Sequence, residues 1–342
     1  MNMKEYIQST VVFAIMLLVI PCVVFLGAGK PVPDREEGSS APQGSQPPRE
    51  IIPTGEKVKI LSAKSGEINE YTMDDYVLGA VMAQMPSDFE PAALQAQAVL
   101  ARTYALHRTK SESANPTPEL KGAVMSDDTN LYQAFFTPDQ AKEFYKENYE
   151  QARTKILDAV KATHDKYLSY ADEPVLIAFH AVSCGYTASA KEAWGQDIPY
   201  LSSVESKSDE TLEISGSELT LTEDQFKEKI TGAYKDIKTD SPSDKWLEIT
   251  QMGSHGYVLC ARVFTQTLTG MRLCELLGLN SPVFTVEHSK GKFIFKTKGV
   301  GHMVGMSQFG ANEMAKQGKS CDDILTHYFP GTKLTQISSP GT

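Results

Sequence analysis

The sequence predicts an α+β fold, because strand-like and helix-like stretches occur in separate groups rather than as alternating βαβ units. Short runs rich in β-branched and aromatic residues indicate strands at 57–61, 175–182, 257–264, 284–288 and 292–298. Other stretches show the residue spacing of amphipathic helices. No internal repeat is present. A doubly wound parallel sheet is therefore disfavoured.

Local signals mark where the helices begin. Pro91 occupies the expected first position of a helix that continues to about residue 108, since proline suits the first helical turn. Residues 138–163 form a second, long amphipathic stretch. Capping boxes at 222–225 and 320–323 indicate two further helix starts. The helices are thus as clearly signalled as the strands.

The composition is that of a folded, acidic protein. Of its 342 residues, 41% are apolar, and they include 14 Phe and 14 Tyr, which is enough for a sizeable core. The formal charge is −10, whereas a nucleic-acid-binding protein needs a positive field to attract phosphates. The sequence therefore predicts no nucleic-acid partner.

Residues 11–29 are the segment that suits a membrane. They contain no charged side chain, and as a helix they would span roughly 28 Å, close to one hydrocarbon core. A cleaved signal peptide is disfavoured, because such peptides have apolar regions of about 7 to 15 residues. We expect one transmembrane helix that anchors the chain in the membrane, preceded by a short cytoplasmic flank at 1–10.

The chain after this anchor divides into a linker and a folded part. Residues 30–53 hold six of the 18 prolines and cannot bury enough surface to offset the entropy of ordering them. Residues 54–342 have the mixed pattern of a globular domain. The predicted location is the cell membrane, with a single pass, a cytoplasmic N-terminus and an extracytoplasmic domain.

No metal and no cofactor is predicted. The cysteines beyond the anchor form no C-x-x-C pair and have no histidine at ligand spacing, which disfavours zinc. They fit buried free thiols slightly better than disulfides, and are Cys184, Cys260, Cys274 and Cys321. The glycines of 299–305 miss the dinucleotide-binding spacing, and 305–309 misses the nucleophile elbow of serine hydrolases.

Three segments, 76–106, 179–209 and 299–334, carry more information than their surroundings. Taken together, in this order and behind a membrane anchor, they resemble the stage II sporulation protein D family. The resemblance covers about residues 57–336. It rests on Met-Pro after Gln84, on the runs AQAVLARTYAL and PYL, and on GHMVGMSQFGANEMAKQG followed by HYFPGTKL.

The resemblance implies a fold, an activity and partners. The fold is a mixed α and β body with a long glycan-binding groove, which agrees with the α+β prediction. The activity is that of lytic transglycosylases related to the amidase enhancer domain, which cut peptidoglycan during engulfment. The implied partners are peptidoglycan glycan strands, a sporulation amidase and membrane partners of the engulfment complex.

Lytic transglycosylation needs one carboxyl group that acts twice. It donates a proton to the leaving oxygen of the glycosidic bond, and then accepts the proton of the muramic C6 hydroxyl as the 1,6-anhydro ring closes. The resemblance implies that this residue is a glutamate directly before Met-Pro, where this chain has Gln84. An amide cannot transfer a proton in this way. Gln95 likewise stands where the family has a lysine.

Other family positions expected to line the groove are matched. Together with Gln95, the predicted substrate-binding residues are Arg102, Tyr200, Asp209, His302 and Gln308. The sequence therefore predicts a groove that is retained, with its catalytic carboxyl and its partner lysine both replaced.

Two functions from different classes follow. In the first, the chain is an enzyme in which Asp88, Glu90 or Glu192 replaces the missing carboxyl. In the second, it is a catalytically silent protein that binds glycan strands and acts as a scaffold or amidase enhancer. Acidic residues just ahead of a helix are ordinary N-terminal charges, so the second function is favoured over turnover by the usual mechanism.

Overall fold

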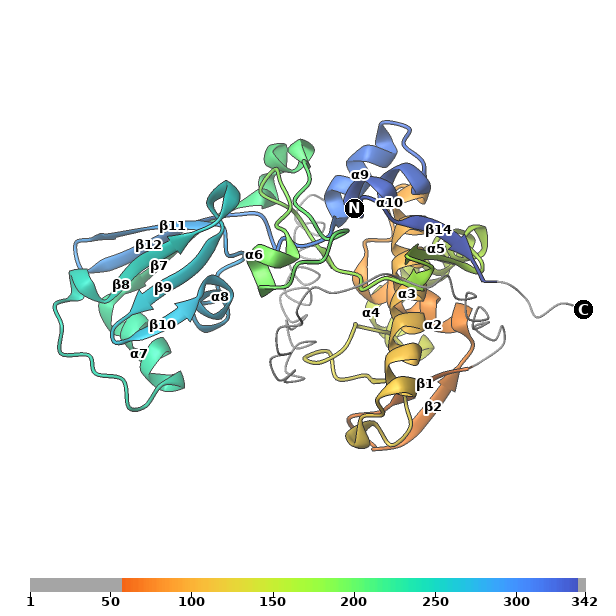
Figure 1. Ribbon diagram of the computed structural model, residues 1–342, viewed down its shortest axis with the longest axis horizontal. Coiled ribbons are helices and arrows are strands. Elements are labelled where there is room, and N and C mark those ends of the chain that lie inside the picture. Colours follow the sequence, from red (N-terminus) through yellow and green to blue (C-terminus); the bar gives the residue numbers. More distant parts are fainter. Residues whose placement is uncertain (1–56, 338–342) are drawn as a thin grey trace, which may run out of the picture.

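The computed structural model describes residues 57–337, which form two lobes of unequal size (Figure 1). The larger lobe comprises residues 57–206 and 300–337. The smaller lobe, residues 216–298, is inserted into the larger one along the chain. Each lobe has its own hydrophobic core, and Tyr257 and Val283 of the inserted segment pack into the core of the larger lobe. The predicted folded part therefore contains two packing units.

The N-terminal segments predicted from the sequence lie outside the described residues. They are the flank at 1–10, the membrane anchor at 11–29 and the linker at 30–53. In the part of the chain that the structure describes, no helix combines the length and the apolar character that crossing a bilayer requires.

The larger lobe is built mainly by the first part of the chain. Its elements are β1 (Val58–Leu61), β2 (Ile68–Tyr71), α2 (Met73–Gln84), α3 (Pro91–Ala114), β3 (Met125–Ser126), α4 (Pro138–Tyr145), α5 (Tyr149–Ala162), β4 (Lys166–Tyr170), β5 (Glu173–Pro174), β6 (Phe179–His180) and α6 (Ala190–Trp194). The chain returns to this lobe with β13 (Met306–Ser307), α9 (Gln308–Lys316), α10 (Cys321–Tyr328) and β14 (Lys333–Gln336). The strands pair in the orders β2-β1-β3, β14-β4-β5 and β13-β6.

The smaller lobe packs helices against two antiparallel sheets. Its elements are β7 (Gly216–Thr222), α7 (Glu223–Ala233), β8 (Leu247–Met252), β9 (Val258–Val263), β10 (Gln266–Thr269), α8 (Gly270–Leu277), β11 (Phe284–Ser289) and β12 (Lys292–Lys298). The sheets have the orders β10-β9-β8 and β11-β12-β7. Phe226 stacks on Phe293 with ring centroids 4.4 Å apart. Burying such a side chain stabilises a fold by about 1.5–3 kcal/mol.

Helix α3 lies in the core of the larger lobe and contacts α2, α5, α9 and α10. Pro91 begins it, as predicted. Alanines such as Ala93, Ala96 and Ala101 are fully buried along it, and their small side chains let the neighbouring helices approach closely. This packing brings the end of α2 and the start of α9 to the same part of α3.

The α+β prediction is confirmed, and one predicted strand is mostly wrong. The run 175–182 forms a strand only at Phe179–His180, which pairs in parallel with β13. The partner explains the difference, because β13 has two residues and Val182 makes only an isolated bridge to Val300. The buried run therefore has no long neighbouring strand with which to extend a ladder.

The long helical stretch predicted at 138–163 is interrupted. A 3-10 turn at Lys146–Asn148 separates α4 from α5, and Lys146 takes a positive φ of 50°. The hydroxyl of Tyr145 donates a hydrogen bond to the carbonyl of Met82, 2.9 Å away, and so fixes the end of α4 against α2. The capping boxes at Thr222 and Ser320 are confirmed.

The predicted free thiols are confirmed, with one difference in burial. All four cysteines of the described residues are free. Cys184, Cys274 and Cys321 are buried, whereas Cys260, on β9, is half-buried. Burial raises the pKa of the Cys321 thiol to about 12, which keeps it protonated and unreactive.

The two lobes touch through the turn that follows β8. The carboxylate Oε1 of Glu192, on α6, accepts a hydrogen bond from the backbone N–H of Ser254 at 2.6 Å. The rings of Tyr186 and His255 stack with centroids 3.9 Å apart. Figure 1 accordingly shows α6 between the two lobes.

Candidate functional site

The candidate site is built around Gln84, the last residue of α2. The backbone N–H of Met85 bonds to Val81 and closes the helix, and Met85 then turns to an extended conformation. Gln84 itself is only 1% exposed. Its side chain therefore has to find all of its hydrogen bonds inside the protein.

Three neighbours satisfy the Gln84 amide. Its Nε2 donates to the carbonyl of Ala134 at 2.6 Å. Its Oε1 accepts from Nε2 of Gln97 at 2.8 Å and from Nε2 of Gln133 at 3.1 Å. The donor and the acceptor of this amide are thus both used, and the side chain is held in one orientation.

Further glutamines extend this network across three elements. Nε2 of Gln308, at the start of α9, donates to the backbone carbonyl of Gln84 at 2.9 Å and to Oε1 of Gln97 at 3.3 Å. The hydroxyl of Tyr76 donates to Oε1 of Gln133 at 2.9 Å. We call Gln84, Gln97, Gln133 and Gln308 the glutamine cluster. Each of its members is buried.

The hydrogen bond to Ala134 limits which side chains suit position 84. A carbonyl oxygen at 2.6 Å requires a donor. The Gln84 amide supplies one, and a protonated glutamic acid of nearly the same shape would supply one too. An ionised carboxylate would place an acceptor oxygen against the carbonyl oxygen of Ala134 in a buried site. Leaving such groups without a donor typically costs about 1–3 kcal/mol and at most several kcal/mol. The cluster therefore fits an amide or a neutral acid.

Arg102 lies in a different network, although it is on the same helix as Gln95 and Gln97. Its side chain is fully buried. Nη1 donates to the carbonyl of Thr163 at 2.7 Å, and Nη2 donates to Oδ1 of Asp74 at 2.9 Å. Burial lowers the pKa of Arg102, and the Asp74 carboxylate opposes that shift. In this structure the guanidinium joins α3 to α2 and to the end of α5.

Gln95 differs from Gln97 in exposure. Gln95 is half-buried, whereas Gln97 is fully buried. The two residues lie on different faces of α3, because positions two apart in a helix do not face the same way. Gln97 instead shares its buried face with Leu94 and Ala101. Gln95 is thus the more accessible of the two amides.

Asp209 is also buried and belongs to a separate serine-rich network. Its Oδ2 accepts from the backbone N–H of Ser183 at 2.8 Å and from Oγ of Ser206 at 3.1 Å. Burial raises the pKa of Asp209, and these hydrogen bonds partly oppose the rise. Its contacts tie the segment after β6 to the turn at residue 206.

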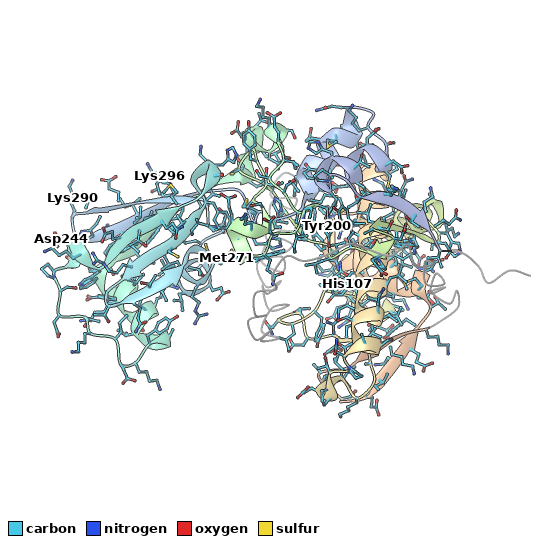
Figure 2. The ribbon with its side chains drawn as sticks, viewed as in Figure 1. His107, Tyr200, Asp244, Met271, Lys290 and Lys296 are labelled. Atoms are coloured by element: carbon cyan, nitrogen blue, oxygen red, sulfur yellow. The ribbon has the colours of Figure 1, made fainter. Side chains whose placement is uncertain are left out.

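Tyr200 and His302 are the half-buried members of the predicted binding set. Figure 2 shows Tyr200 in the larger lobe. Its hydroxyl accepts a hydrogen bond from the backbone N–H of Leu176 at 3.1 Å. Nδ1 of His302 accepts from the backbone N–H of Val304 at 3.1 Å. Burial lowers the pKa of His302 to about 4, so that its ring is neutral at neutral pH.

The structure thus brings Gln84 and Gln308 together in one hydrogen-bond network. Arg102 and Asp209 belong to two further networks, and neither is bonded to the glutamine cluster. Sequence reasoning missed Gln97 and Gln133. The periodicity of the buried face of α3 could have indicated Gln97, whereas Gln133 lies in an irregular segment that carries no such signal.

The acidic residues considered as substitutes lie in different surroundings. Asp88 is exposed in the turn between α2 and α3. Glu90 precedes α3, and its backbone N–H donates to Oδ1 of Asn312 at 2.7 Å. Burial acts to raise the pKa of Glu192, but hydrogen bonds from Ser254 and Ser189 outweigh it and lower that pKa. Glu192 is therefore ionised at neutral pH.

Metal ligands do not gather at this site. Between residues 57 and 337, no group of three or more His, Cys, Asp or Glu side chains is arranged to hold a metal ion. The polar side chains of the glutamine cluster are neutral amides, which bind metals weakly unless carboxylates accompany them.

Comparisons with known proteins agree with the resemblance drawn from the sequence. A family profile described as "Stage II sporulation protein" matches residues 62–170. The chain is 32% identical to stage II sporulation protein D of Bacillus subtilis (strain 168), over 98% of this chain and 97% of that protein. It is 33% identical to the protein of that name from Bacillus amyloliquefaciens, over 87% and 83% of the two chains.

A more distant relative carries a different name. The amidase enhancer of Bacillus subtilis (strain 168) is 26% identical over 75% of this chain, but the match covers only 40% of that protein. The two sporulation proteins, by contrast, match along most of both chains at more than 30% identity. This chain is therefore a member of the stage II sporulation protein D family.

Proposed function

We propose that this protein acts on the cell wall during sporulation by binding the glycan strands of peptidoglycan. Its family gives the sporulation context, and the name of the more distant relative, amidase enhancer, suggests work beside a wall amidase. In this proposal the protein is a glycan-binding scaffold or enhancer related to lytic transglycosylases. It does not cut glycan by their usual acid and base chemistry.

The observation that carries the proposal is that position 84 holds a buried amide in place of a carboxyl group. Gln84 is buried, and the amide is satisfied by Ala134, Gln97 and Gln133. A side chain with no exchangeable acid proton near neutral pH cannot protonate a leaving oxygen. The hydrogen bonds around it nevertheless suit a neutral glutamic acid, which is the form that a general acid needs. We infer that an ancestral acid was replaced by its neutral isostere while its surroundings were kept.

The second candidate function, turnover by a substitute acid, has less support. Glu192 has a lowered pKa, so that it would be an ionised base at the start of a reaction that needs an acid. Asp88 is exposed to solvent, so no enclosed site surrounds its carboxyl group. Neither side chain is hydrogen-bonded to the glutamine cluster.

The remaining partners follow from the predicted topology. We propose that residues 11–29 anchor the chain in the cell membrane, and that residues 30–53 let the folded lobes reach the wall. A sporulation amidase and the membrane proteins of the engulfment complex are then the expected protein partners. These proposals rest on the sequence.

Binding and cutting can be separated in one experiment. The full chain, solubilised in detergent, is mixed with glycan strands from which an amidase has removed the stem peptides. We expect the protein to sediment with the strands and the supernatant to contain few or no 1,6-anhydro products. Protein that stays in solution would contradict glycan binding. Abundant anhydro products would contradict the silent-scaffold proposal.

A further inference from the structure

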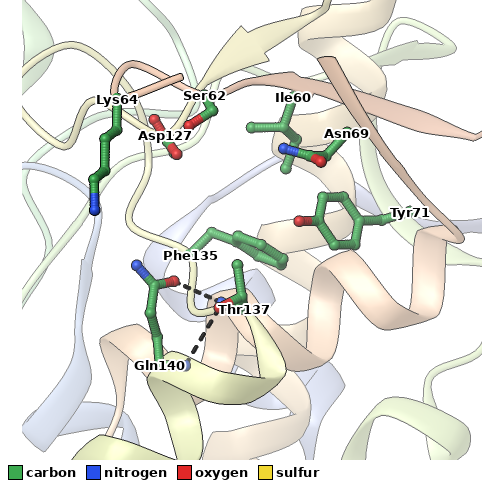
Figure 3. Close-up of a pocket in the computed structure, with 9 residues that line it drawn as sticks. All are labelled: Ile60, Ser62, Lys64, Asn69, Tyr71, Asp127, Phe135, Thr137 and Gln140. Carbon is green, nitrogen blue, oxygen red and sulfur yellow. Dashed lines mark hydrogen bonds between the residues drawn. The ribbon is translucent and has the colours of Figure 1, made fainter. Parts of the chain in front are cut away.

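A hollow with polar and apolar lining residues lies at Phe135, the residue that follows Ala134 in the chain (Figure 3). Its volume is about 280 Å³, just below the usual range of ligand sites, about 300–1,000 Å³. It has room for one sugar-sized group. Its lining residues come from β1, the turn after β1, β2, the segment before α4 and the first turn of α4. Those that form the proposed contacts are Ile60, Lys64, Asn69, Tyr71, Asp127 and Phe135.

The walls of this hollow combine apolar and aromatic surface. Tyr71 and Phe135 meet edge to face with ring centroids 4.9 Å apart. Ile60 adds an aliphatic wall from β1. Figure 3 shows the rings of Tyr71 and Phe135 facing the same space, with the Tyr71 hydroxyl pointing into it. A sugar ring has apolar C–H faces that pack against such surfaces.

Several hydrogen-bonding groups that face the hollow are available. Among the described residues, no hydrogen-bond or ion-pair partner is found for Nζ of Lys64, for the Asn69 amide or for the Tyr71 hydroxyl. Burial, and the charge of Asp127, raise the pKa of Tyr71, so its hydroxyl remains a donor. Oδ1 of Asp127 accepts from the backbone N–H of Ala63 at 2.6 Å, which leaves Oδ2 free as an acceptor.

The charges in the hollow indicate a neutral ligand. Lys64 and Asp127 are its ionisable side chains with opposite charge, and they offset each other. A ligand with a strong negative charge would be attracted by one and repelled by the other. Hydroxyl and acetamido groups, by contrast, can accept from Lys64 and Asn69 and donate to Asp127. An N-acetylated hexosamine carries both kinds of group.

The hollow is joined to position 84 through a short segment of chain. Gln133 and Ala134 bind the Gln84 amide, and Phe135, the next residue, lines the hollow. Tyr76 completes the connection, because its ring stacks on Phe135 at 5.7 Å and its hydroxyl donates to Gln133. A ligand that packs on Phe135 would therefore contact the same segment of chain that binds the Gln84 amide.

We propose that the hollow between the β1–β2 hairpin and the segment 127–140 binds one N-acetylhexosamine unit, separately from the glutamine cluster. The sugar would come from a glycan strand, and in this respect the inference rests on the proposed function. Asn69, Lys64 and the Tyr71 hydroxyl supply its hydrogen bonds, and Tyr71 and Phe135 supply its apolar contact.

The strand β2 offers a matched control for this proposal. Asn69 pairs with Ile60 and faces the hollow, whereas its neighbour Glu70 pairs with Lys59 on the opposite face. Asn69 and Glu70 are both exposed. Asn69→Ala and Glu70→Ala therefore truncate adjacent side chains on the same strand, and only the first removes a proposed sugar contact.

Saturation-transfer NMR with N,N′-diacetylchitobiose, the dimer of N-acetylglucosamine, tests the site in the full chain in detergent. We expect transfer to the acetamido methyl group of the sugar. Asn69→Ala and Tyr71→Phe should each weaken binding roughly two- to tenfold, the usual effect of one lost hydrogen bond. Glu70→Ala should bind as the unchanged protein does. Lys64→Ala serves as a further variant, because an exposed lysine can be truncated without disturbing the fold.

Sedimentation with amidase-treated glycan strands is run in parallel. If the strands bind while the disaccharide shows no transfer, or if Asn69→Ala and Glu70→Ala behave alike, the sugar site is wrong and the proposed function stands. If the disaccharide binds and responds to these variants while the strands do not bind, the sugar site is supported and the proposed function is wrong.

Discussion

At the residue scale, position 84 combines two requirements that an amide and a neutral acid both satisfy. It must donate to Ala134 and accept from Gln97 and Gln133. Breaking one hydrogen bond of a buried network leaves a polar group without a partner, which costs about 1–3 kcal/mol. Replacing a glutamic acid by Gln84 therefore removes the group that transfers protons, while the packing and the hydrogen bonds around it are kept.

His180, which is buried, and His302, which is half-buried, make the stability of the larger lobe depend on pH. Burial lowers the pKa of His180 to about 3 and that of His302 to about 4, from an ordinary value of 6.5. Both rings then bind protons more readily in the unfolded chain than in the folded one. Stability is fully present above pH 6.5 and is lost as the pH falls toward these lowered values.

We expect the free energy of unfolding in urea to fall between pH 6.5 and pH 4.5. The loss should reach about 1.4 kcal/mol per pH unit for each histidine. Carboxyl groups also titrate at the lower end of this range, so His302→Asn provides the control. In this variant the slope of the free energy of unfolding against pH should correspond to about one proton fewer. A slope that is the same in His302→Asn would contradict the account of this ring.

Which predicted residues meet could be inferred only in part from the sequence. Gln84 and Gln308 were both predicted, and their contact depends on how α9 packs on α3, which spacing along the chain cannot show. The resemblance to the family predicts that Arg102 lines the groove. The structure buries it instead, because Asp74 and the carbonyl of Thr163 provide partners for a guanidinium inside the fold.

At the element scale, α2 depends on a glycine to approach the segment that holds Gln84. A Cβ added at Gly79 would lie 2.4 Å from the backbone oxygen of Phe136 and 2.4 Å from Cε2 of Phe135. The carbonyl of Gly79 also accepts from the backbone N–H of Phe136 at 3.1 Å. This close approach sets the position of Ala134 against Gln84.

Gly79→Ala should therefore destabilise the protein, even though alanine favours helices more than glycine by up to about 1 kcal/mol. We expect a net loss of about 1–3 kcal/mol in thermal or urea unfolding, typical of overpacking. Gly232→Ala in α7 is the matched control, because nothing lies within 4 Å of its added Cβ, and it should be neutral or stabilising. Equal effects of the two changes would argue against the close packing of α2.

The elements that the sequence predicted best are those with strong local signals. Thr222 and Ser320 begin helices as their capping boxes indicated, and β12 shows the expected alternation of buried and exposed residues. The run 175–182 is apolar like a central strand, yet its strand is limited by the two-residue partner β13. The length of a strand depends on its neighbour, which the run itself does not encode.

At the scale of the whole molecule, the described residues form two lobes with hydrophobic cores of their own. The sequence predicts that a linker at 30–53 separates them from the anchor at 11–29. We expect a chain that lacks residues 1–30 to be soluble and folded, and the full chain to remain with the membrane fraction. Circular dichroism and fractionation of cell extracts would check this. Aggregation of the shortened chain, or full-length protein in the soluble fraction, would contradict a single N-terminal anchor.

The central claim is that an amide at position 84 silences a site whose surroundings still suit an acid. Converting it back with Gln84→Glu should place a neutral carboxyl against Ala134, with the hydrogen bonds of Gln97 and Gln133 kept. General acid and base catalysis by a positioned carboxyl is worth about 10²- to 10⁴-fold. The resemblance to the family, which has a lysine at position 95, predicts that the double change Gln84→Glu with Gln95→Lys exceeds the single one.

The measurement is mass spectrometry of the products released from amidase-treated glycan strands. The unchanged chain should release few or no 1,6-anhydromuropeptides, and Gln84→Glu should release them readily. Gln97→Glu is the control, since it introduces the same group elsewhere in the cluster and should give no turnover. Abundant anhydro product from the unchanged chain, lost in Asp88→Asn, Glu90→Gln or Glu192→Gln, would contradict the account and identify the acid in use.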